Sequence, residues 1–262
     1  AERFVALGLA PARLTVTGNL KFDTTPPDPR PSLELRQRLG PARPVWLAAS
    51  THEGEEAIVL AAHRAVRARY PQAVLILAPR HPQRFADAAR LASAGGWSTV
   101  RRSSDTGGEC AVYVADTLGE LPALMAAADV VFVGGSLGCS AGAKGGHNLI
   151  EPAQVARPVL FGPYMHNFAT LREQIIDAGA GWQVASSREL ATAIGKLFDD
   201  ADTRRRMGDA GAALVARHRG ATARTLSVIE ACLERDQGDG TAAGVTAGAV
   251  ASSQLLTRAR SS

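Results

Sequence analysis

The chain has 262 residues, of which 46% are hydrophobic and 21% charged, so it has the composition of a globular protein with one or two domains. The net charge of +4 favours anionic ligands, but Lys and Arg are spread along the chain and aromatic residues make up only 5%, so we identify no nucleic-acid-binding motif. The spacing of the three cysteines is not typical of a metal-binding or redox motif, which favours a protein of the reducing cytoplasm. No apolar run reaches the roughly 18 residues of a membrane span.

The N-terminal region predicts short elements and then a linker. Residues 2–9 are typical of the end of a helix, and residues 13–17 of a short strand that leads into the segment GNLKFD. Four prolines between positions 26 and 31 predict a stiff, extended interdomain linker. Because the sequence starts in the middle of a pattern, we expect residues 1–25 to be the end of an N-terminal domain that is mostly absent.

From Ser32 onward, helical and strand patterns alternate, and we expect helices capped by Ser32, Asn148 and Asn167. This alternation predicts an α/β fold, a Rossmann-like parallel sheet with helices on both faces. The expected strands are 44–49, 73–78, 98–102, 111–115, 130–133, 159–161 and 181–184.

The predicted domain spans residues 32–215. Two helical patterns, 201–219 and 221–235, close the chain, and we assign a C-terminal helix to 216–236. The remaining residues, 237–262, are mostly Gly, Ala, Thr and Ser and predict a disordered tail, because such a composition buries too little apolar surface to order itself.

Four loops are expected to form the ligand side of the sheet, because ligands of such sheets bind beyond the carboxyl ends of the strands. They are 50–55, 79–84, 116–120 and 134–151, and they contain nearly all the unusual polar residues. In the last loop, glycines end a buried strand, and Asn148 precedes a helix predicted at 149–156. The N-terminus of that helix can hold an anion.

Three charged residues stand out, and each has two interpretations. Glu151, in the first turn of that helix, either complements the helix dipole or accepts hydrogen bonds from the two vicinal hydroxyls of a ribose. Arg80, held between Pro79 and Pro82, is either a solvated side chain or a rigid guanidinium that forks onto a phosphate. Lys21 is either a surface lysine or neutralises a departing phosphate.

Other motifs are excluded or left open. The glycine loop is neither a Walker A loop, since Gly145 follows Lys144 where Ser or Thr is required, nor a GxGxxG fingerprint. His52-Glu53 lacks the second histidine of a zinc HExxH motif, so we predict no metal site. His81 and His147 lie in ligand-side loops, where each has either a chemical role or only a hydrogen-bonding one.

Seven motifs occur in one order between residues 3 and 185: VTGNLKFD, ASTHEGEE, APRHPQRF, DTLGEL, FVGGSL, GGHNLIEPA and FGPYMHNF. Together they resemble the carboxyl-terminal half of the 3-deoxy-D-manno-octulosonic acid (Kdo) transferases. The resemblance implies the C-terminal half of a GT-B glycosyltransferase, which moves Kdo from a CMP-Kdo donor to a lipid A precursor in lipopolysaccharide biosynthesis. It also implies a location at the cytoplasmic face of the bacterial inner membrane, with neither cofactor nor metal.

The resemblance further assigns residues by motif. Lys21 corresponds to a transition-state stabiliser, and the general base, a glutamate of the N-terminal domain, is expected to be absent, so the chain alone should be inactive. Ser50 and the residues Gly134, Gly135 and Ser136 are candidate contacts to the donor. The residues implied to contact CMP are Pro79, Arg80, Leu118, Gly119, Glu120, Asn148, Leu149, Ile150 and Glu151.

One departure from the family pattern lies at 138–144, where the family usually has only a few residues. This longer segment is either a lid over the sugar or a tolerated insertion. Two alternatives to a Kdo transferase remain at this point. One is another GT-B glycosyltransferase or a sugar-nucleotide epimerase, and the other is a non-catalytic nucleotide-binding module.

Overall fold

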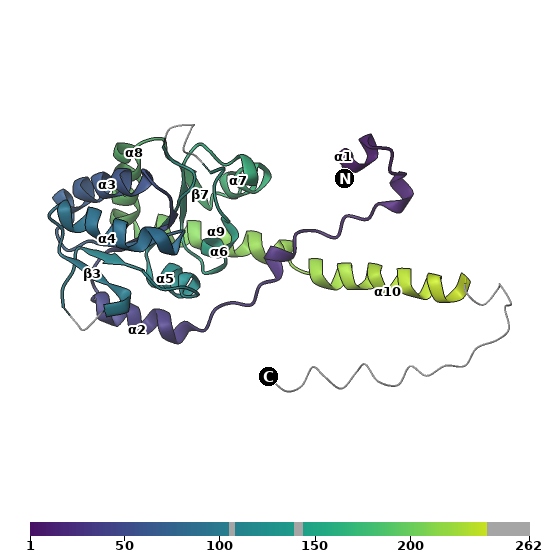
Figure 1. The fold of residues 1–262 in the computed structure, drawn as a ribbon, viewed down its shortest axis with the longest axis horizontal. Coiled ribbons are helices and arrows are strands. Elements are labelled where there is room, and N and C mark those ends of the chain that lie inside the picture. The colour runs from purple at the N-terminus through teal and green to yellow at the C-terminus, as the bar shows by residue number, and fades with distance from the viewer. Residues whose placement is uncertain (105–107, 139–143, 240–262) are drawn as a thin grey trace. The chain divides into compact units, whose positions relative to one another are not determined.

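The structure, a computed structural model, describes residues 1–104, 108–138 and 144–239 (Figure 1). Its contacts divide the chain into two compact units. We call residues 19–219 the α/β unit, and residues 1–18 together with those from Gly220 onward the terminal unit. The longer segment at 138–144 lies mostly outside the described residues, as does the tail from residue 240.

The terminal unit contains α1 (Glu2–Ala6), the 3-10 turn η1 (Pro11–Arg13) and α10 (Ala221–Asp239). The strand predicted at 13–17 is wrong: no described strand pairs with this segment, and a strand needs a partner for its backbone groups. Instead, Arg224 Nε donates a hydrogen bond to the Thr17 carbonyl (2.9 Å). Helix α10 continues to Asp239, beyond the position 237 at which the disordered tail was predicted to start.

The α/β unit is built on seven strands, and every strand pairs in parallel with its neighbours. The order across the sheet is β3-β4-β2-β1-β5-β6-β7. This confirms the predicted parallel α/β fold. The strands are β1 (Val45–Thr51), β2 (Val74–Pro79), β3 (Thr99–Arg101), β4 (Val112–Val114), β5 (Val130–Val133), β6 (Val159–Phe161) and β7 (Gly181–Gln183).

The strand order reverses between β1 and β5. From β1 the chain builds outward through β2 to β4 and β3, and from β5 it builds the other way through β6 to β7. At such a switch point the loops after the two central strands diverge and leave a crevice at the carboxyl edge. The central strands are unbroken apolar runs because helices cover both of their faces.

Helices cover the sheet on two sides (Figure 1), and two separate clusters of buried residues mark these sides. One cluster packs α2, α5, α6 and α7 against the sheet, the other packs α3, α4 and α8, and α9 contributes to both. The helices are α2 (Pro29–Leu39), α3 (Glu55–Arg69), α4 (Phe85–Ala94), α5 (Leu121–Ala127), α6 (Ile150–Gln154), α7 (Ala169–Asp177), α8 (Ser187–Asp199) and α9 (Ala201–His218).

The proline-rich segment is shorter than predicted. Helix α2 starts at Pro29 rather than after Ser32, because the Asp28 carboxylate caps it and accepts a hydrogen bond from the Arg30 amide (2.9 Å). Proline fits the first helical turn, where its missing N–H is not needed and its φ is already helical. Residues 29–31 of the predicted linker are therefore helical.

Three other local predictions are wrong. Asn167 does not cap α7: it lies in the 3-10 turn η5 (His166–Phe168), and its side-chain amide donates to the Lys144 carbonyl (2.9 Å). The helix predicted at 149–156 is the shorter α6, and Leu149 takes the N-cap position. Helix α9 ends at His218, so residues 216–218 belong to α9 and not to the final helix.

Candidate functional site

A cavity of about 430 Å³ lies at the carboxyl edge of the sheet, at the switch point between β1 and β5. We call it the switch-point cavity. Its volume is within the range of small-molecule sites. Its lining comes from seven segments of the α/β unit: Lys21, Thr24, Ala49, Ser50, Arg80, Leu121, Met125, Val133, His147, Asn148, Glu151 and Phe168.

Arg80 presents a positive charge to this cavity. It directly follows Pro79, the last residue of β2, and its amide donates to the Thr51 carbonyl (2.9 Å), which fixes the backbone where β1 and β2 end. Among the described residues, the Arg80 guanidinium has no hydrogen-bond or ion-pair partner. All five of its N–H donors are therefore available to a ligand.

Glu151 brings a negative charge to the cavity, and Asn148 holds its side chain in place. The Asn148 side chain accepts a hydrogen bond from the Ile150 amide at Oδ1 and donates one to Glu151 Oε1, both at 3.1 Å. Within the described part of the chain, the second carboxylate oxygen of Glu151 has no partner, so it can accept from a ligand hydroxyl. The side chains of Leu149 and Ile150 are buried in the core and leave only their backbone for ligand contact.

Lys21 is held beside α6 by contacts on both sides of it. It lies in the 3-10 turn η2 (Leu20–Asp23), where Asn19 Oδ1 accepts a hydrogen bond from the Lys21 amide (3.0 Å). The Thr24 hydroxyl donates to Gln154 Oε1 (2.8 Å), and Gln154 Nε2 donates to the Thr24 carbonyl (2.6 Å). The Lys21 ammonium lies 5.2 Å from the centre of the Phe168 ring, so it stays in the cavity without an acidic partner among the described residues.

Ser50 adds a backbone feature to the cavity. Its φ of 54° is in the left-handed region, which is uncommon for a non-glycine residue, and the β1–β2 register shifts between Ala49 and Thr51. Strained residues of this kind concentrate at binding sites. The structure therefore brings together Lys21, Ser50, Arg80, Asn148 and Glu151, five of the residues selected from the sequence.

Residues 116–120 are not among those that line the cavity. Leu118 is 71% exposed. The Glu120 carboxylate accepts from Arg102 Nη2 (2.8 Å) and Nε (3.2 Å) and from the Thr117 hydroxyl, and the hydrogen bonds from Arg102 hold the pKa of Glu120 below its ordinary value. The next residue, Leu121, lines the cavity instead.

The turn after β5 is organised by Glu55, whose role the sequence did not reveal. Glu55 Oε2 accepts hydrogen bonds from the amides of His52 (3.0 Å) and Gly135 (2.6 Å), and Oε1 accepts from those of Ser136 (3.0 Å) and Leu137 (2.9 Å). Burial raises the pKa of Glu55, and these four bonds oppose that shift. The sequence indicated no more than an acidic residue directly after Gly54, at the start of a predicted helix.

The backbone N–H groups of the candidate donor contacts 134–136 donate to other groups of the protein. The Gly134 amide donates to the Ala49 carbonyl (2.8 Å), and the Ser136 hydroxyl donates to the Val133 carbonyl (2.5 Å). A Cβ at position 134 would lie 2.8 Å from the Ser50 carbonyl oxygen, so only glycine fits there. Gly135 has a φ of 69°, which also favours glycine.

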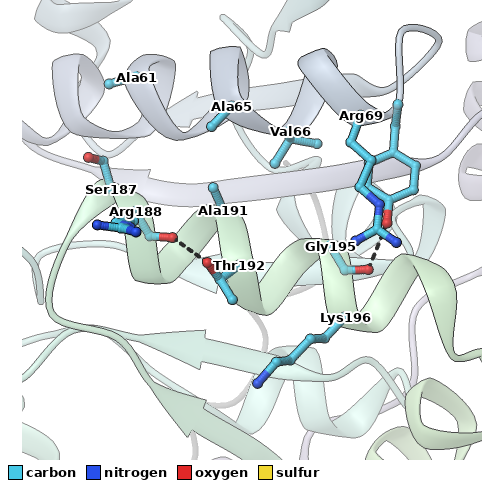
Figure 2. A pocket seen from close by; sticks show the side chains of 11 residues that line it. Ala61, Ala65, Val66, Arg69, Ser187, Arg188, Ala191, Thr192, Gly195 and Lys196 are labelled. Carbon is cyan, nitrogen blue, oxygen red and sulfur yellow. Dashed lines mark hydrogen bonds between the residues drawn. The ribbon is translucent and has the colours of Figure 1, made fainter.

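A separate cavity of about 500 Å³ lies away from this edge, between α3 and α8, and we call it the α3–α8 groove. Figure 2 shows that small side chains line it, among them Ala61, Ala65 and Ala191, with Arg69 and Lys196 towards one end. It contains none of the residues selected from the sequence. Ligands of parallel sheets bind beyond the carboxyl ends of the strands, so the switch-point cavity is the better candidate site.

The remaining described residues show neither a cluster of three metal-ligating side chains nor a helix long and apolar enough to cross a membrane. A seven-stranded parallel sheet with a cavity at its switch point places the chain among the carboxyl-terminal domains of GT-B glycosyltransferases. No protein-family model matches the chain.

Individual proteins are clearly similar to it. The chain is 35% identical to the Kdo transferase of Haemophilus influenzae over 240 residues, which cover 90% of this chain and 55% of that protein. It is 40% identical to the Kdo transferase of Bordetella pertussis over 228 residues, 82% of this chain and 51% of that one. The C-terminal CMP-Kdo binding domain of WaaA from Acinetobacter baumannii superposes with a TM-score of 0.67 at 28% identity, covering 75% of this chain and 99% of that domain.

The chain is therefore homologous to the Kdo transferases and corresponds to their carboxyl-terminal domain, as its motifs predict. It spans about half the length of the curated relatives it matches.

Proposed function

We propose that this chain is the donor-binding half of a Kdo transferase and that the switch-point cavity holds the CMP part of CMP-Kdo. The observation that carries the proposal is the convergence of a free guanidinium, a half-free carboxylate and a lysine on one cavity at the switch point. The similarity to a domain described as binding CMP-Kdo supports the choice of nucleotide.

Each group has a chemical role in this proposal. Arg80 forks onto the phosphate of CMP, and Glu151 accepts hydrogen bonds from the ribose hydroxyls through its free oxygen. Asn148 orients Glu151 through the bond to its other oxygen. The apolar wall of Leu121 and Met125 covers one side of the nucleoside. Contacts of CMP with Pro79, with residues 118–120 and with the backbone of residues 149–150 belong to the same proposal.

Transfer of the sugar requires charge to be stabilised on the leaving group. An acceptor hydroxyl attacks the anomeric carbon of Kdo, the bond to the CMP phosphate breaks, and negative charge collects on that phosphate. Lys21, held over Phe168 without an acidic partner in the described structure, stabilises this charge together with Arg80. Ser50 contacts the sugar beyond the phosphate. Glu55 holds the turn 135–137, and contact of Gly134, Gly135 and Ser136 with the donor belongs to the same proposal.

The whole reaction includes parts that this chain does not span. We propose that the acceptor is a lipid A precursor, that the general base comes from the other half of the enzyme, and that the reaction belongs to lipopolysaccharide biosynthesis at the cytoplasmic face of the inner membrane. A boundary between the two domains near residue 26 belongs to the same proposal. The chain alone should bind nucleotide without catalysing transfer.

Calorimetric titration tests the site. Glu151→Ala should weaken CMP binding about 10- to 100-fold, because a hydrogen bond to a charged group contributes about 1.5–3 kcal/mol. The 2′-deoxy form of CMP should bind the wild type more weakly than CMP does, but should bind Glu151→Ala as CMP does. Glu173→Ala, an exposed acid on α7, is the matched control. Equal CMP affinity of the wild type and Glu151→Ala refutes the ribose role.

The same titration separates the alternatives. Tighter binding of UDP than of CMP would favour another GT-B glycosyltransferase or an epimerase. Combining the chain with the amino-terminal half of a homologous Kdo transferase and assaying Kdo transfer tests the catalytic part of the proposal.

A further inference from the structure

Three histidines from three different loops meet next to the switch-point cavity. His52 follows β1, His81 follows β2, and His147 ends the glycine loop after β5. The rings of His52 and His147 lie end to end in nearly one plane, with centres 5.0 Å apart and planes 3° apart, and their Nε2 atoms are 2.8 Å apart. His81 contacts the other side of this pair edge-on, with its ring centre 5.3 Å from that of His52.

This cluster joins two cavities. His147 lines the switch-point cavity, whereas His52 and His81 line a neighbouring cavity of about 450 Å³ together with Glu53, Arg84 and Lys144. The single hydrogen bond between His52 and His147 lies between the two spaces. The two cavities are therefore neighbours, one on each side of this pair.

Charged groups of both signs surround the second cavity. Arg84 is neutralised, because its guanidinium pairs with Asp87 (2.9 Å), Glu56 (3.5 Å) and Glu53 (3.9 Å). The ammonium of Lys144 has no acidic partner in the ranges that the structure describes, and neither does the guanidinium of Arg80, which precedes His81.

The pKa values of His52 and His147 are both lowered. Burial lowers the pKa of His52, and the charges of His81, Lys144 and Arg80 add to that effect. Burial and the same surroundings lower the pKa of His147 to about 4. In the neutral pair, the Nε2–H of one ring donates a hydrogen bond to the Nε2 of the other. This bond fixes the two rings relative to each other, and neither ring carries a charge.

The position of Lys144 is fixed by its backbone. Its amide donates to the Gly135 carbonyl (3.1 Å), and its carbonyl accepts from Asn167 Nδ2 (2.9 Å). The flexible side chain therefore starts from a defined point at the edge of the cavity. The single ammonium of Lys144 matches the charge of a monoanion rather than that of a dianion.

We propose that His52, His81 and Lys144 form a subsite for the carboxylate of the donor sugar, beside the nucleotide site and separated from it by His147. This inference rests on the proposed function. In a 2-keto sugar acid such as Kdo, the carboxylate is attached to the anomeric carbon that is bonded to the phosphate. Arg80 and His81, adjacent in one loop, then serve the phosphate and the carboxylate of the same donor. A carboxylate only accepts hydrogen bonds, and the imidazole N–H and ammonium groups donate them.

The test compares two ligands on the same variants. CMP and freshly synthesised CMP-Kdo are titrated into the wild type, into His81→Gln with Lys144→Met, and into the control Lys196→Met, which removes a lysine from the distant α3–α8 groove. The double variant should bind CMP within twofold of the wild type and CMP-Kdo at least tenfold more weakly. CMP-Kdo with its carboxylate converted to an amide should bind the wild type and the double variant equally well.

The possible failures can be told apart. If the wild type does not bind CMP, the nucleotide site itself is refuted. If the wild type binds CMP but the double variant weakens both ligands equally, or neither of them, the carboxylate subsite is refuted while the nucleotide site stands. Both substituted side chains are exposed, so the variants should unfold at the wild-type temperature, which a thermal scan checks.

Discussion

The buried carboxylate of Glu55 is a sensitive point of the site. Each of its oxygens accepts two backbone hydrogen bonds, and these bonds fasten the turn 135–137 to the segment that starts α3. In Glu55→Gln the side chain keeps its size, but an amide N–H₂ replaces one oxygen. The new amide group then faces two backbone N–H groups, either those of His52 and Gly135 or those of Ser136 and Leu137, and these two lose their acceptor.

The expected cost follows from that count. Each buried N–H that loses its acceptor costs about 1–3 kcal/mol, so two of them lower the free energy of unfolding by about 2–6 kcal/mol. Urea denaturation followed by far-UV circular dichroism measures this change as a lower midpoint at an unchanged slope. Nucleotide affinity should also fall, because the Gly146 amide, next to the cavity-lining His147, donates a hydrogen bond to the Gly135 carbonyl of this turn.

Glu53→Gln is the matched control, two residues away, with a side chain that is 84% exposed. It should change stability by no more than about 0.5 kcal/mol. A loss below 1 kcal/mol for Glu55→Gln would refute the view that this carboxylate holds the turn.

The buried His63 and two buried helical glycines carry the remaining predictions. Burial lowers the pKa of His63 from 6.5 to about 3, so the unfolded chain binds an extra proton in that window, and stability falls by up to about 1.4 kcal/mol per pH unit as the pH drops through it. His63→Gln should show a shallower fall in urea titrations between pH 7 and pH 4, and an unchanged slope would contradict this. In Gly208→Ala the added methyl would clash with the Ala156 carbonyl, so the free energy of unfolding should fall by about 1–3 kcal/mol. In Gly195→Ala the added methyl makes only ordinary contacts, so the free energy of unfolding should rise by about 0.5–1 kcal/mol. Equal shifts of the two variants in thermal unfolding would contradict this packing.

The fold was predictable because its signals are local. The runs that form β1, β2 and β5 are apolar without interruption, which is what a strand covered on both faces requires. The start of α2 was missed because the prolines of a helical first turn and those of a linker look alike in sequence. Only the capping bond from Arg30 to Asp28 distinguishes them.

The site was predictable where residues directly follow a strand. Arg80 and Ser50 lie in the cavity because parallel strands end at one edge. Glu55 could not be assigned, because its partners are some 80 residues further along the chain. Glu120 was expected beside the nucleotide, but its carboxylate faces Arg102, and that pairing depends on how β3 and β4 lie together.

The central claim is that CMP binds at the switch point between β1 and β5. A titration of the ¹⁵N-labelled chain with CMP, followed by heteronuclear NMR, tests it most directly. The account predicts that the amide signals of Ser50, Arg80 and Glu151 shift with a single binding curve while those of Ala61 and Ala191 in the α3–α8 groove stay unchanged. Shifts confined to the groove, with the signals at the carboxyl edge unmoved, would contradict it.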